Sequence, residues 1–208
     1  MVMKKLVFVL IVIAANCVCA WNSASEMERE FCVALTNSDH LLSAAFTNQL
    51  FASTNLISAE ERCEVFMLSA IHAAQCFEET VDECWTQEEM RHASNAVVAI
   101  GLQTNKWQYW MSRFVYAGAC ASRSDYDGCF RVMTNSLNEI VSSGFTNDVS
   151  SVGRLLLRKY EMSDIGVREA MKVMAGMSAA VTGNGNAATN YANQVPFSYK
   201  NTILRFVK

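Results

Sequence analysis

Turn-forming residues are scarce in this chain, which has one proline (Pro196) and nine glycines among 208 residues. β-Sandwiches and β-barrels join many short strands, and glycine and proline usually mark the turns between them. The scarcity therefore argues against those folds. Ala, Leu, Met, Glu and Gln are common instead, which favours helices.

Other absences limit the function. The chain has 17 Lys and Arg residues against 20 Asp and Glu residues and no basic cluster, so its composition does not suggest a nucleic-acid partner. It contains no HExxH, no GxSxG, no phosphate-binding glycine loop and no Ca²⁺ loop. We therefore predict a protein that is not an enzyme and that uses no cofactor and no metal.

No apolar run is long enough to span a membrane, but the beginning of the chain resembles a secretory signal peptide. Two lysines precede an apolar run at residues 6–15, about half the length that a bilayer requires. Val18 and Ala20 are small enough for a cleavage site before Trp21. We predict that residues 1–20 are removed on secretion, which changes the net charge from −3 to −5 because the two lysines are lost.

Six cysteines remain in the predicted mature chain: Cys32, Cys63, Cys76, Cys84, Cys120 and Cys129. An even number of cysteines in an exported protein indicates disulfides, here three. Buried free thiols are the alternative. A zinc site is not expected, because there is no CxxC and no histidine at zinc-finger spacing from a cysteine pair.

Capping patterns and apolar spacing predict the helices. Ser58 and Glu61 form a capping box before apolar residues spaced three and four apart, and Thr86 and Glu89 form a second one. Trp85 and Met90 have the spacing of a hydrophobic staple around the second box. The expected helices cover residues 59–79, 87–103, 106–120, 125–143, 147–160 and 164–179. We expect one helical, disulfide-rich domain over residues 21–181, followed by a loop and an extended C-terminal tail over residues 182–208.

A short sequence pattern of cysteine and Thr-Asn recurs along the chain. Thr-Asn pairs ending at Asn48, Asn105 and Asn147 each follow a cysteine by 16 to 21 residues, and a cysteine follows the first two by 15 residues. Repeated helical hairpins produce this kind of pattern, and chance similarity is the alternative. The predicted fold is an all-α, disulfide-stabilised bundle of about six or seven helices, which the repeat suggests is built from such hairpins.

An up-and-down arrangement of the helices limits the disulfide pairing. Four cysteines are then expected at one end of the bundle, which leaves Cys32 to pair with Cys63. For the other four we favour Cys84–Cys120 and Cys76–Cys129. The local pairs Cys76–Cys84 and Cys120–Cys129 are nearly as compatible with the short turns between helices.

Histidines offer no convincing metal site. Glu88 and His92 are four residues apart on one predicted helix, but no third ligand is visible, so an exposed charged pair is expected. His72 lies within an apolar helix and is expected to be partly buried and hydrogen-bonded.

Methionines and aromatic residues are the candidates for binding an apolar ligand. The residues concerned are Trp107, Trp110, Phe114, Met171 and Met174, together with Tyr116, Met162 and Met177. Methionine adapts to irregular apolar partners, so these side chains are suited to line a cavity. A core filled by the same flexible side chains is the alternative.

Two classes of function fit these features. The first is a secreted, extracellular binding module that recognises a protein partner or carries a small apolar molecule. The second is a structural component of a secreted matrix, such as that of a hard tissue. The sequence alone does not separate them.

Overall fold

The computed structural model describes residues 58–145 and 148–207. These residues form eight helices and no strands, which confirms the predicted all-α class. The helices are α4 (Ala59–Thr80), α5 (Cys84–Ile100), α6 (Trp107–Ser122), α7 (Tyr126–Ile140), α8 (Ser151–Lys159), α9 (Val167–Val181), α10 (Gly185–Ala192) and α11 (Phe197–Leu204).

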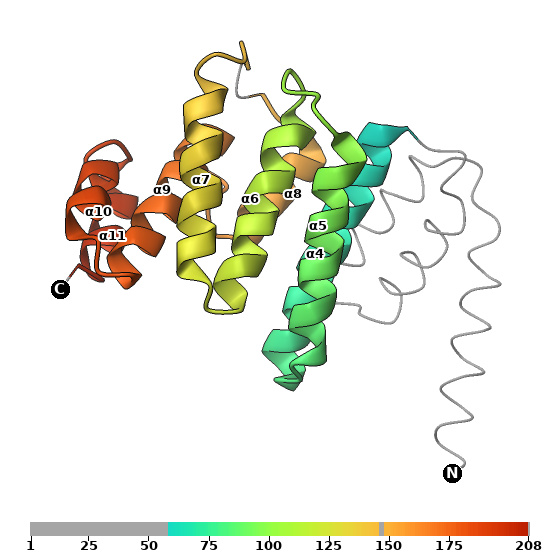
Figure 1. Ribbon diagram of the computed structural model, residues 1–208, viewed down its shortest axis with the longest axis horizontal. Helices are drawn as coiled ribbons and strands as arrows, with labels where there is room; N and C mark the ends of the chain where they lie inside the picture. Colours follow the sequence, from blue (N-terminus) through green and yellow to red (C-terminus); the bar gives the residue numbers. More distant parts are fainter. Residues whose placement is uncertain (1–57, 146–147, 208) are drawn as a thin grey trace.

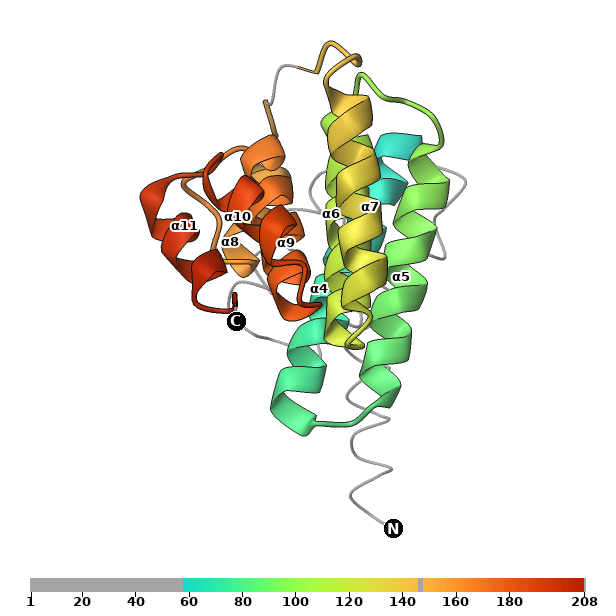
Figure 2. The ribbon, with the colours of Figure 1, turned by 60° about the vertical axis from the view of Figure 1, so that its left-hand side comes forward.

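The helices are arranged from one side of the molecule to the other in nearly their sequence order (Figure 1). The α4–α5 hairpin lies at one side, α6 and α7 follow, and α9, α10 and α11 form the opposite side (Figures 1 and 2). The short helix α8 packs behind α6 and also contacts α4. Helix α6 thus contacts α4, α5, α7, α8 and α9, and it is the centre of the fold.

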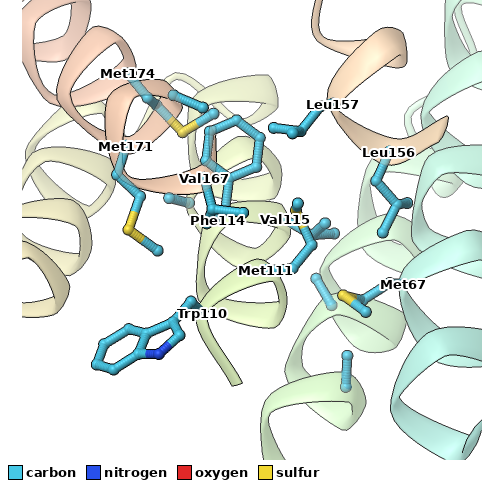
Figure 3. Close-up of a cluster of buried hydrophobic side chains, with 14 of the residues drawn as sticks. Met67, Trp110, Met111, Phe114, Val115, Leu156, Leu157, Val167, Met171 and Met174 are labelled. Atoms are coloured by element: carbon cyan, nitrogen blue, oxygen red, sulfur yellow. The ribbon is translucent and has the colours of Figure 1, made fainter. Parts of the chain in front are cut away.

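Large apolar side chains of α6 form the middle of the core. Trp110, Met111 and Phe114 are fully buried. Figure 3 shows Phe114 between Met174 of α9 and Leu157 of α8. Burial of an aromatic side chain of this size supplies a large share of the hydrophobic stabilisation of a small domain, so the position of α8 and α9 depends on α6.

The first predicted capping box is confirmed. The Glu61 amide donates to Ser58 Oγ at 3.1 Å, and the Ser58 amide donates to Glu61 Oε2 at 2.7 Å. Two of the otherwise unpaired amides at this helix end are therefore satisfied.

The second predicted capping box is wrong. Helix α5 begins at Cys84, so Thr86 already lies inside it, and Thr86 Oγ1 donates to the Glu83 carbonyl at 2.9 Å. The N-cap residue is Glu83, which makes no side-chain cap bond, and Asp82 Oδ1 accepts the Cys84 amide at 3.0 Å. Glu89 points into the protein and is only 1% exposed. Glu89, one of the residues that suggested a helix start, is therefore a buried residue inside α5.

The loop and extended tail expected after residue 181 contain two helices. Asn184 caps α10 by accepting the Ala187 amide at 3.1 Å, and α11 follows Pro196. Both helices pack on α9. The contact is close at Gly176, where a Cβ atom would lie 2.7 Å from Ile203 Cδ1. The absence of a side chain on α9 thus allows α11 to approach it.

The predicted disulfides are not found among the described residues. Cys63, Cys76, Cys84, Cys120 and Cys129 are free thiols, so Cys84–Cys120, Cys76–Cys129 and the local pairs Cys76–Cys84 and Cys120–Cys129 are all unformed. All but Cys84 are buried, where a thiol packs as a small apolar group. Among the described residues, apolar packing holds the helices together without a crosslink.

Several predictions lie outside the described residues. They are the signal peptide at 1–20, the pair Cys32–Cys63, and the Thr-Asn pairs at Asn48 and Asn147. Within residues 58–145 and 148–207, no helix combines the length and the hydropathy needed to cross a bilayer.

Candidate functional site

A half-open pocket of about 460 Å³ lies between α6, α7, α9 and α11. Its apolar wall consists of Met162, Val173, Met174, Met177, Val181 and Phe206. Its volume falls within the range of small-molecule binding sites, which is roughly 300–1,000 Å³. Methionines adapt their shape to an occupant, so this wall is suited to an apolar molecule.

The turn after α8 forms one side of the pocket. Tyr160, Glu161 and Met162 follow one another and all line it. Glu161 has a left-handed backbone with φ of 58°, and the Met162 amide donates to the Leu157 carbonyl at 2.9 Å. This tight reversal places three consecutive side chains around one cavity.

A glycine of α6 makes room for the Tyr160 ring. A Cβ atom at Gly118 would lie 2.3 Å from Tyr160 Oη, closer than any two such atoms can approach. The ring also packs edge-on against Phe114, with ring centroids 4.9 Å apart. The Tyr160 hydroxyl is thus held against α6 at the inner part of the pocket.

Tyr199 links α11 to Glu161 and Asp164 at the opposite rim of the pocket. Its hydroxyl donates to the Glu161 carbonyl at 3.1 Å and also bonds the Asp164 carboxylate. Burial, followed by these acidic neighbours, raises the pKa of Tyr199 to about 12. The phenol therefore stays protonated and keeps both contacts at neutral pH.

A buried carboxyl group lies beyond the α6 side of the pocket. Ser122, which lines the pocket, donates to Glu89 Oε1 at 3.2 Å. Glu89 Oε2 is buried and has no hydrogen-bond partner among the described residues. Burial, reinforced by the charge of Glu78, raises the pKa of Glu89 to about 7.

The predicted ligand-binding residues fall in two places. Met174 lines the pocket, as do Met162 and Met177. Trp110, Phe114 and Met171 belong to the fully buried core, and Trp107 packs against Gly153 of α8. Sequence reasoning missed Tyr160 and the residues of α11, because only the tertiary fold brings them to the methionines.

The buried thiols are not suited to nucleophilic chemistry. Burial raises the pKa of Cys129 to about 11, and it raises the pKa of Cys63 further still. Burial also raises the pKa of Cys76 and Cys120. Because the thiolate is the reactive form, these thiols are poorly suited to act as catalytic nucleophiles in the folded protein.

His92 is buried and not part of an exposed pair, contrary to prediction. Its Nε2 lies 3.6 Å from Glu88 Oε2, yet burial and the charge of Arg91 lower the pKa of His92 to about 4. His72 is buried as well, with its Nε2 3.4 Å from Cys76 Sγ. Within the part of the chain that the structure describes, no three His, Cys, Asp or Glu side chains form a group that could hold a metal ion.

Comparison with known proteins assigns no relative: no family model, no curated protein and no solved structure matches the chain.

Proposed function

We propose that this protein is a secreted binding module that carries a small apolar molecule in the pocket between α6, α7, α9 and α11. The observation that supports this proposal is the methionine-rich wall formed by Met162, Met174 and Met177 around a cavity of about 460 Å³. A core filled by flexible side chains would leave no such space.

The pocket also favours this proposal over a role as a structural matrix component. A matrix protein requires durability, and an open apolar cavity reduces packing and contributes nothing to durability. A cavity does benefit a carrier, because it removes apolar ligand surface from water.

Binding of the neutral fluorophore N-phenyl-1-naphthylamine tests the proposal. We expect saturable binding with enhanced fluorescence and a micromolar dissociation constant. Val181→Trp should weaken binding at least tenfold, because Val181 lines the pocket and is 47% exposed at its rim. The added ring has room to occupy the cavity without displacing the core.

Val98→Trp provides the matched control, since Val98 lies on α5, is 78% exposed and does not line the pocket. It should bind the fluorophore as the unmodified chain does, and both variants should keep the helical circular dichroism signal. The absence of saturable binding, or equal losses in the two variants, would contradict the proposal.

Secretion leads to a second expectation, which concerns the cysteines. Cys84 lies close enough to Cys76 for its charge to raise the pKa of the Cys76 thiol, and Cys120 acts on Cys129 in the same way. This proximity favours the local pairs over the crossed ones when the protein meets an oxidising compartment. Peptide mapping of the secreted protein without reductant should yield Cys76–Cys84 and Cys120–Cys129 peptides. Recovery of these four cysteines as free thiols from the medium would refute this expectation.

A further inference from the structure

The Tyr160 hydroxyl is a hydrogen-bonding group without a partner among the described residues, at a site that is otherwise largely apolar. It lines the pocket against Gly118, and none of the described residues hydrogen-bonds it. Burial raises the pKa of Tyr160 far above its usual range, and the charge of Glu89 acts in the same direction. The hydroxyl therefore remains a donor at any physiological pH.

The charged side chain that lines the pocket, Glu161, is acidic. Among the described residues that line it, none is Lys, Arg or His. Glu161 lines the pocket, Asp164 bonds the lining residue Tyr199, and Glu89 lies behind Ser122. A bound carboxylate would meet these acidic groups and lose its hydration without a cation to replace it.

We propose that the pocket selects a neutral apolar molecule with one oxygen acceptor, such as an alcohol, ketone or ester, whose oxygen accepts a hydrogen bond from Tyr160, and that it rejects the corresponding carboxylate. The inference rests on the proposed function and specifies its ligand class. The methionine wall supplies contact area, and the hydroxyl distinguishes ligands with an oxygen from those without one. The acidic surroundings distinguish neutral ligands from anions.

Competition between two molecules of equal chain length tests this selectivity. 1-Decanol and decanoate are each used to displace N-phenyl-1-naphthylamine from the full chain at pH 8. We expect the dissociation constant of decanol to be at least tenfold lower than that of decanoate. The fluorophore has no oxygen to accept a hydrogen bond from Tyr160, so its binding reports chiefly on the apolar wall.

Tyr160→Phe removes the hydroxyl and leaves the ring. It should weaken decanol binding about fivefold, as expected for the loss of one neutral hydrogen bond, and weaken fluorophore binding less than decanol binding. Tyr191→Phe is the matched control, because Tyr191 lies on α10 and does not line the pocket, and it should leave both dissociation constants unchanged.

The outcomes separate the two proposals. Saturable fluorophore binding that Val181→Trp weakens as expected, together with equal displacement by decanol and decanoate, would overturn the ligand class and leave the carrier function standing. An unchanged decanol affinity in Tyr160→Phe would overturn the role of its hydroxyl. Absence of fluorophore binding would remove the carrier function, and the ligand class with it.

Discussion

Phe114→Ala is expected to lower the free energy of unfolding by about 3–5 kcal/mol. Phe114 is fully buried and lies where α6, α8 and α9 meet (Figure 3). Its removal loses the transfer free energy of the ring and leaves a cavity that three helices must share. Urea denaturation followed by circular dichroism at 222 nm measures the change.

Phe197→Ala is the control for this substitution. Phe197 lies on α11 and is 76% exposed, so the same chemical change should alter the free energy of unfolding by less than about 0.5 kcal/mol. Similar losses in the two variants would show that Phe114 is not at the centre of the core.

A second large effect is expected in the pH dependence of stability, where Glu89 and His92 act in opposite directions. The pKa of Glu89 is raised to about 7 in the folded protein from an ordinary value of 4.5. The folded state therefore holds this proton more tightly than the unfolded state does. Between pH 4.5 and 6.5, rising pH should cost about 2 kcal/mol of stability through Glu89.

His92 contributes a pH dependence of stability opposite in sign to that of Glu89. Its pKa falls from 6.5 to about 4 on folding, so the unfolded state takes up the proton more readily. Falling pH between 6.5 and 4.5 should therefore cost about 2 kcal/mol through His92. The two contributions nearly cancel. We therefore expect the stability of the unmodified protein to depend little on pH through Glu89 and His92 together.

Single substitutions should reveal each contribution. In Glu89→Gln only the His92 effect remains, so the stability should fall by about 2 kcal/mol between pH 6.5 and 4.5 relative to the unmodified protein. In His92→Gln only the Glu89 effect remains, so the stability should rise by about the same amount between pH 6.5 and 4.5 relative to the unmodified protein. The double variant should again follow the unmodified profile.

Urea midpoints at a series of pH values provide the measurement. The change in stability with pH is compared between variants, and not the absolute stability at one pH. This comparison separates the effect of titration from the packing effect of each substitution. Parallel profiles for the two single variants would show that neither group titrates as its burial requires.

Much of the helical architecture could be predicted, because the signals are local. The capping box at Ser58 and the apolar spacing of α4 depend on residues within a few turns of one another. The helices near Thr86 and Asn184 show where local sequence signals fail to predict the structure. Helix α5 begins at Cys84, whose amide bonds Asp82, so the helix starts before the capping box predicted at Thr86. The glycines and asparagines around Asn184 indicate a loop, yet packing on α9 stabilises a helix there.

The pocket could be predicted only in part. The late methionines indicated an adaptable apolar surface, and three of them line the cavity. The aromatic residues of α6 gave the same signal but fill the core, because composition does not distinguish a buried face from a pocket wall. The contact between Gly118 and Tyr160 joins residues that are far apart in the sequence, and no periodic pattern predicts it.

The helix that closes one side of the pocket has a further consequence. Helix α11 has eight residues, and a helix of that length is not stable on its own in water. It stays folded through its contacts with α9 and α10 and through Tyr199. An occupant that touches α11 would therefore add to the forces that keep this helix in place. On the proposed carrier function, ligand binding and the folding of α11 are therefore thermodynamically linked.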